Sequence, residues 1–122
     1  MGNEKICLIW NWIHSKANII PSLKELNINI SAISSTYEEN VKIIWVNYYN
    51  DYKKMIDTEN PTIIFIVTKA ELQYGITKYC IEKNIKKIFV EKPMWMNFKE
   101  AKELEELTIS KICKLYVWIM KK

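Results

Sequence analysis

The chemistry open to this chain is limited by how few reactive side chains it has and by how they are spaced. His14 is the only histidine, and Cys7 precedes it in a short apolar run. A Cys–His nucleophile needs contact between the two side chains, whereas Cys7 is expected inside a strand and His14 beyond its end. The cysteines lie far apart, without a C-x-x-C pair (Cys7, Cys80, Cys113). We therefore expect no metal site, and reduced thiols packed as small hydrophobic residues in a cytoplasmic protein.

Bulk composition excludes further classes of function. The chain of 122 residues is 49% hydrophobic and 26% charged, as expected for one globular domain covering residues 1–122. Its apolar runs, such as residues 63–67, are too short to cross a membrane, and we expect no secretory signal. The net charge of +4 comes from lysines interleaved with acidic residues. Because there is no basic stripe with aromatics among the cations, we expect no nucleic-acid partner.

The elements that must position any site follow from an alternation of strand and helix patterns. Apolar runs of strand length cover residues 5–10, 28–34, 62–68, 87–90 and 115–120, with a weaker run at 43–46. Helical spacing covers a stretch that ends near Leu26, and residues 49–56, 72–80 and 98–107. Asn97 and Glu100 predict a capping box, and Asn84 a left-handed helix end. The alternation predicts an α/β fold, a doubly wound parallel sheet with helices on both faces in three αβα layers.

One segment carries a family resemblance. The stretch PTIIFIVTKAELQYGITKYCIEKNIKKIFVEKPMWMNFKEAKELEEL resembles the N-terminal dinucleotide-binding domain of the glucose-fructose oxidoreductase/inositol dehydrogenase (Gfo/Idh/MocA) family. There, one strand ends in Thr-Pro and the next in Glu-Lys-Pro, which here is Glu91, Lys92 and Pro93. The resemblance extends from KICLIW to LYVWIM. It implies a Rossmann domain with NAD or NADP across the carboxyl ends of the strands. It also implies that Lys92 reaches the active site from a turn that Glu91 and Pro93 shape.

Three features that would hold the dinucleotide differ from the family pattern. The glycine-rich turn falls on Trp10, Trp12 and Ser15, so indole rings stand where backbone should approach the pyrophosphate. The acidic residue that would hold the ribose falls on Ser35, and the chain has no arginine to hold a 2′-phosphate instead. Of the Thr-Pro only Thr68 is present. The core-forming strands therefore match the family better than the cofactor-binding positions do.

Two functions are compatible with these departures. In the first, the chain is a non-catalytic binding or interaction module, a partner or regulatory subunit, with no cofactor expected for the isolated chain. Trp10 and Trp12 then either fill the cofactor cleft or, with Trp95, form an aromatic anchor for a partner. In the second, the chain is the NAD- or NADP-binding half of a split oxidoreductase, with Lys92 in its catalytic role. The chain stops near the point where the family's substrate domain begins, so we expect no dehydrogenase activity from it alone.

The last strand leads to an expectation about partners. Without a substrate domain beside it, the run LYVWIM would leave an apolar strand at the edge of the sheet. Exposed strand edges pair readily with other chains. We therefore expect a protein partner, or self-association into a homo-oligomer, at this uncovered sheet edge.

Overall fold

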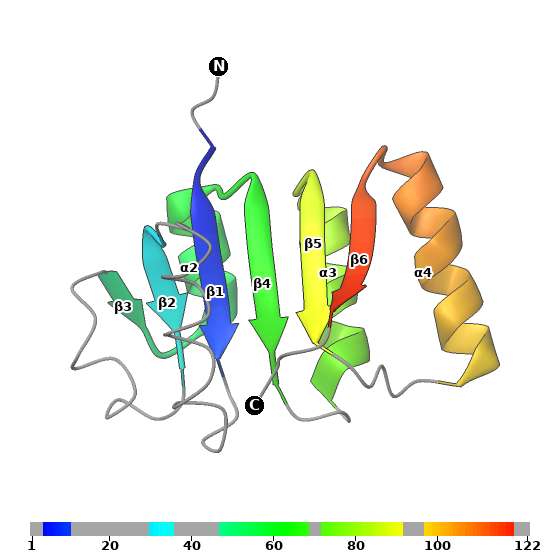
Figure 1. Ribbon diagram of the computed structural model, residues 1–122, viewed down its shortest axis with the longest axis horizontal. Helices are drawn as coiled ribbons and strands as arrows, with labels where there is room; N and C mark the ends of the chain where they lie inside the picture. Colours follow the sequence, from blue (N-terminus) through cyan, green and yellow to red (C-terminus); the bar gives the residue numbers. More distant parts are fainter. Residues whose placement is uncertain (1–3, 11–29, 36–46, 69–71, 92–96, 119–122) are drawn as a thin grey trace.

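The computed structural model describes residues 4–10, 30–35, 47–68, 72–91 and 97–118. These residues contain a six-stranded sheet and the helices that pack on it (Figure 1). Its strands are β1 (Ile6–Trp10), β2 (Ala32–Ser34), β3 (Asn47–Tyr49), β4 (Ile63–Val67), β5 (Lys87–Glu91) and β6 (Lys114–Trp118). Their order is β3-β2-β1-β4-β5-β6, and every neighbouring pair is parallel. This is the Rossmann order, in which the direction of winding reverses between β1 and β4. The predicted α/β parallel sheet is confirmed.

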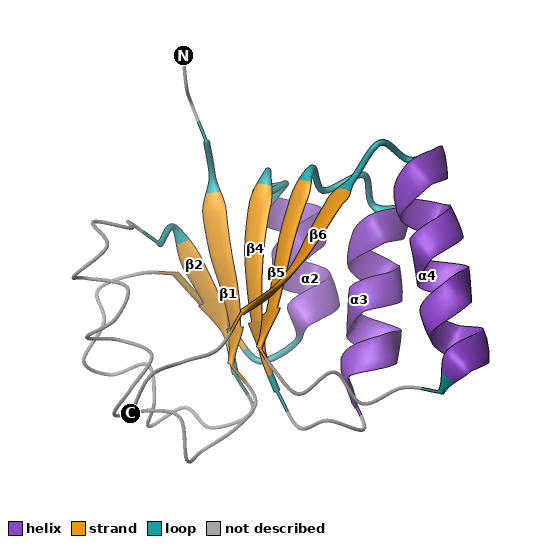
Figure 2. Ribbon diagram, turned by 45° about the vertical axis from the view of Figure 1, so that its right-hand side comes forward, coloured by secondary structure: helices purple, strands orange, loops and turns teal. Residues whose placement is uncertain are grey.

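The described helices lie together on one face of the sheet (Figure 2). They are α2 (Tyr52–Glu59), α3 (Gln73–Glu82) and α4 (Phe98–Ser110). The predicted capping box is confirmed, since the Glu100 N–H donates to Asn97 Oδ1 at 2.7 Å and Glu100 Oε1 accepts from the Asn97 N–H at 3.2 Å. The helix expected before Leu26 falls outside the described residues. A helical layer on the opposite face therefore stays a prediction.

The boundaries differ from prediction mainly around β3. Helical spacing suggested a helix over residues 49–56, but α2 begins only at Tyr52, and residues 47–49 form β3. This strand is three residues long and largely exposed, so its pattern carries little periodicity. The run at residues 43–46 lies outside the described residues. Of the strand predicted over residues 28–34, the described part pairs only from Ala32.

Alternate residues of the central strands point into two apolar clusters. On the helix-covered face, Cys7 and Ile9 of β1 pack with side chains from the neighbouring strands and helices. On the opposite face, Leu8 and Trp10 pack with residues of β2 and β4 (Ile33, Phe65, Val67). The expected burial of the cysteines is confirmed, because Cys7, Cys80 and Cys113 are all buried and free. Burial raises the pKa of the Cys7 thiol to about 12, so it stays neutral at physiological pH.

Among the described residues, three non-glycine residues adopt the left-handed conformation where helices end. Asn60 follows α2 and Asn84 follows α3, with φ of 50° and 64°, which confirms the role predicted for Asn84. Asparagine tolerates this conformation well. Ile112 follows α4 with φ of 54° and is 87% exposed. A β-branched residue is strained in this conformation, and Ile112 gains no burial in return.

We predict that Ile112→Gly stabilises the protein by about 1 kcal/mol, because glycine adopts positive φ without a Cβ clash. The free energy of unfolding is measured by urea titration followed by circular dichroism. Ile112→Ala is the matched control, since it removes the exposed side chain but keeps the Cβ. Equal stabilities of the two variants would show that the backbone at residue 112 is not strained.

Candidate functional site

The candidate site lies at the edge where the parallel strands end. In open α/β sheets, ligands bind outside the carboxyl ends of the strands, at the point where the winding reverses. Trp10 is the last residue of β1 and pairs with Val67 of β4, so this point lies between them. Thr68 follows β4, Ser35 follows β2, and Glu91 ends β5. The sheet therefore brings four predicted site residues to one edge. The others fall outside the described residues (Trp12, Ser15, Lys92, Pro93), as does Trp95.

Trp10 is a core residue in this structure. Its side chain has 0% of its surface exposed and packs with Leu8, Ile33, Phe65 and Val67. Removing a buried tryptophan costs roughly 3–5 kcal/mol, so its ring cannot leave this position cheaply. A side chain without accessible surface cannot contact a partner directly. In this structure the Trp10 ring fills space in the core cluster and has no exposed surface.

Ser35 is closed off from a ligand in a similar way. It is 0% exposed, and both its backbone N–H and its backbone carbonyl are hydrogen-bonded. Its N–H donates to the carbonyl of Tyr49 at 3.0 Å, and its own carbonyl accepts from the Tyr48 hydroxyl at 2.7 Å. A ribose hydroxyl needs an accessible acceptor at the end of the second strand. Ser35 does not provide one in this arrangement.

Thr68 is the described residue of this edge with spare hydrogen-bonding capacity. Its side chain is 1% exposed, and Oγ1 has no hydrogen-bond partner in the described part of the chain. Buried hydroxyls nearly always have a partner, so an unpaired one calls for an explanation. Because Thr68 directly follows β4, its hydroxyl lies at the point where the winding reverses. At this edge, the Thr68 hydroxyl is thus buried without a described partner, and the Trp10 and Ser35 side chains have no exposed surface.

Other kinds of site find no support in the described ranges. No group of three or more histidine, cysteine, aspartate or glutamate side chains there could hold a metal ion. None of the described helices is long and apolar enough to span a membrane. A shallow cavity of about 400 Å³ lies between the C-terminal ends of α2 and α3, at the opposite edge of the sheet. Its carboxylate, Asp57, already pairs with Lys83 at 3.2 Å.

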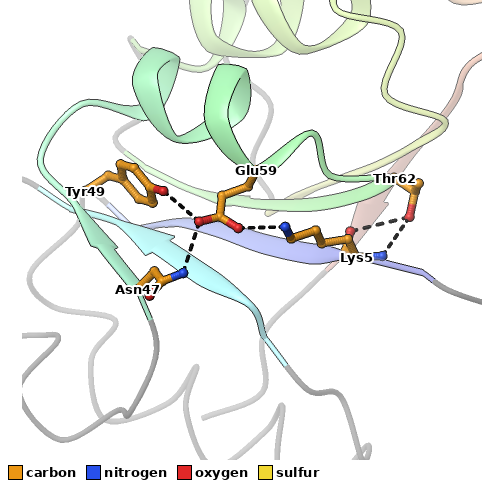
Figure 3. Close-up of polar contacts among 5 residues, drawn as sticks. All are labelled: Lys5, Asn47, Tyr49, Glu59 and Thr62. Carbon is orange, nitrogen blue, oxygen red and sulfur yellow. Dashed lines mark hydrogen bonds and ion pairs between the residues drawn. The ribbon is translucent and has the colours of Figure 1, made fainter.

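A polar cluster that the sequence did not predict centres on Glu59, the last residue of α2 (Figure 3). The buried carboxylate accepts hydrogen bonds from Tyr49 at 2.6 Å and Asn47 at 3.1 Å, and pairs with Lys5 at 2.9 Å. The Lys5 N–H in turn donates to Thr62 Oγ1 at 3.0 Å. Both carboxylate oxygens are thus used, so Glu59 is no free acid or base. The cluster ties together the starts of β1 and β4, the strand β3 and the end of α2.

Comparison with known proteins agrees with the topology. The family model "Oxidoreductase family, NAD-binding Rossmann fold" (Gfo/Idh/MocA) matches residues 11–118. The fold and site edge define a Rossmann domain, and the chain belongs to the Gfo/Idh/MocA oxidoreductase family. The resemblance noted in the sequence is therefore confirmed. No curated protein matches the chain at the level of sequence.

Solved structures share the same fold. An oxidoreductase from Bacillus cereus superposes with a TM-score of 0.79 at 23% identity over 95% of this chain. The WlbA dehydrogenase from Bordetella pertussis, in complex with NADH and UDP-GlcNAcA, has a TM-score of 0.80 at 15% identity over 93% of the chain. An NAD-binding oxidoreductase from Klebsiella pneumoniae has a TM-score of 0.72 at 16% identity over 94% of the chain. The match covers 35%, 36% and 34% of these structures, so the present chain spans about one third of their length.

The Glu59 cluster generates a pH-dependent prediction. Hydrogen bonds from Tyr49 and Lys5 hold the pKa of Glu59 below its ordinary value of 4.5. A carboxyl whose pKa is lower in the folded state stabilises the fold above its unfolded pKa. That contribution is lost as the pH falls through the folded pKa. Glu59→Gln should therefore cost about 1–3 kcal/mol at pH 7, as expected for a buried charged acceptor.

Urea titrations at several pH values measure the free energy of unfolding. The difference in this free energy between wild type and Glu59→Gln should shrink as the pH falls below 4.5. Glu106→Gln is the matched control, because Glu106 is exposed on α4 and should show no such effect. A stability difference for Glu59→Gln that stays constant down to acid pH would contradict the assigned charge network.

Proposed function

We propose that this chain is a non-catalytic binding or interaction module. In this proposal, a Gfo/Idh/MocA-type Rossmann domain with a degenerate dinucleotide site works as the partner or regulatory subunit of another protein. The observation that carries the proposal is the complete burial of Trp10 at the end of β1. The free, buried thiols support a cytoplasmic setting.

A dinucleotide needs space at the end of β1. In a Rossmann site, the first glycine of the fingerprint, where β1 ends, permits the tight turn over which the pyrophosphate lies. By the family pattern, Trp10 occupies that position, and its ring is held in the core cluster. Opening the turn would therefore unpack the core, at a cost that binding of the cofactor would have to offset. Burial of Ser35 adds the loss of an accessible group for the ribose.

Catalysis needs more than the cofactor. Hydride transfer requires that donor and acceptor be held together with water excluded. The chain spans about one third of the length of the solved oxidoreductases that share its fold. The proposal assigns no substrate-holding residues to the described sheet, and Lys92 has no catalytic role in it.

A second function is favoured by Thr68. In this alternative, the chain is the NAD- or NADP-binding half of a split oxidoreductase, and a second polypeptide holds the substrate. The unpaired Oγ1 of Thr68, at the reversal point, would then hydrogen-bond the cofactor. Lys92 would act as the catalytic residue that the family pattern implies. A related structure, the Bordetella WlbA dehydrogenase, contains NADH.

Titration with NADH and NADPH separates the two functions. The chain has five tryptophans, so a nucleotide bound at the carboxyl edge should quench their fluorescence or receive energy from them. We predict no saturable change up to ~1 mM of either nucleotide, which corresponds to binding weaker than about 4 kcal/mol. The Bordetella WlbA dehydrogenase, measured in parallel, is the positive control.

Saturable quenching by either nucleotide below ~1 mM would overturn the closed cofactor site on which the module rests and would favour the split oxidoreductase. In that case, Thr68→Val should weaken binding about tenfold, because it removes the hydroxyl and keeps the shape.

A further inference from the structure

An aromatic row crosses the face of the sheet opposite α2–α4. Phe65 of β4, Phe89 of β5 and Tyr116 of β6 are paired in register. The rings of Phe65 and Phe89 stack with centroids 4.8 Å apart and planes 12° apart. Those of Phe89 and Tyr116 stack at 4.8 Å and 18°. We call these three residues the aromatic row.

Exposure rises along the aromatic row towards the edge of the sheet. Phe65 is 8% exposed, Phe89 is half-buried and Tyr116 is 40% exposed. The described helices all lie on the other face (Figure 2). Parallel sheets are normally covered on both faces, because their strands are apolar on both sides. The exposure of Tyr116 shows that the outer part of this face, over β6, is only partly covered.

A pair of lysines lies beside the aromatic row. Lys87 of β5 and Lys114 of β6 are in register with each other, and each precedes its aromatic neighbour by two residues, on the same face. Both lysines are exposed, and neither has an ion pair in the described ranges. Like charges directly opposite on neighbouring strands destabilise a sheet. An acidic group placed over this pair would remove that repulsion.

We propose that the aromatic row and the lysine pair together bind an acidic amphipathic helix of a protein partner. Three neighbouring strands span roughly 10 Å, which is the diameter of one helix. The apolar face of the helix covers Phe89 and Tyr116, and its acidic residues lie over Lys87 and Lys114. A helix antiparallel to the strands also directs its C-terminal carbonyls at the lysines, which the helix dipole favours. This inference rests on the proposed function, because it names the surface by which the module engages its partner.

Two other occupants fit the surface less well. Because the aromatic rings stack on one another, they present mainly their edges outward, whereas a nucleic acid needs exposed ring faces and a groove of cations. A second copy of the chain would bring a second lysine pair into a symmetric interface, where like charges oppose association. The charge of the surface thus favours an acidic protein segment.

Reversing the charges on the surface and on a bound peptide tests the proposal. The probes are two synthetic amphipathic helical peptides with the same leucine-rich face, one with glutamates and one with lysines in the C-terminal half. Binding is measured by fluorescence anisotropy of the labelled peptides. The wild-type chain should bind the glutamate peptide about tenfold more tightly than the lysine peptide. Lys87→Glu/Lys114→Glu should reverse this preference.

Matched variants separate the surface from general effects of charge and hydrophobicity. Lys99→Glu/Lys102→Glu makes the same charge change at exposed positions of α4 and should keep the wild-type preference. Tyr116→Ser should weaken binding of both peptides about tenfold through lost apolar contact. Phe98→Ser, at a side chain that is 82% exposed on α4, should not. Circular dichroism and urea titration verify that each variant folds.

Several outcomes would overturn the proposal. One is the absence of a preference between the peptides, and another is an equal reversal by the α4 variants. Binding of a single-stranded oligonucleotide that Tyr116→Ser abolishes would assign the surface to nucleic acid. A dimer in sedimentation that Tyr116→Ser dissociates would assign it to a second copy. NADH binding to the same samples would overturn only the proposed function. The peptide measurements test only the aromatic row and the lysine pair.

Discussion

The structure depends on one constraint, that the strands of a parallel sheet must be buried on both faces. In β1, Cys7 and Ile9 point to the helix-covered face, while Leu8 and Trp10 point to the other. Each strand must therefore supply two apolar surfaces within about five residues, which leaves little room for polar groups. The polar residues lie at the strand ends, where hydrogen bonds such as those of Glu59 and Ser35 join neighbouring elements.

This constraint separates what the fold requires from what a cofactor site requires. Core packing requires apolar side chains of suitable volume and tolerates many identities. A dinucleotide site requires bare backbone at one turn and accessible polar groups at particular strand ends. Trp10 satisfies the first requirement, because it packs in the core cluster at the end of β1. The family match therefore reflects the residues that build the sheet. Cofactor binding depends on the residues at the carboxyl edge of the sheet.

The sequence predicted those features that depend on neighbouring residues. The long apolar strands, the Asn97 capping box and the left-handed Asn84 were recognised because each signal is local. β3 was missed, because its three residues are held by pairing with β2 and by the contacts of Asn47 and Tyr49 with Glu59. No local pattern encodes contacts between residues so far apart in the sequence.

The same distinction applies to the candidate site and to the aromatic row. Site positions could be named from the family pattern, but the burial of Ser35 depends on its contacts with β3 and was not predictable. Likewise, Phe89 and Tyr116 look like ordinary core residues in their own strands, and only the register shows that they stack and reach the surface.

The two properties proposed for this protein arise at different places in the sheet. The closed cofactor site depends on Trp10 and Ser35, at the carboxyl edge beside β1 and β2. The proposed partner surface includes Phe89 and Tyr116, on the outer face of β5 and β6. An apolar surface next to paired lysines remains unfavourable in water whether or not a nucleotide binds, since its energy depends on area and charge alone. The proposed partner surface would therefore be the same in a module and in a split enzyme.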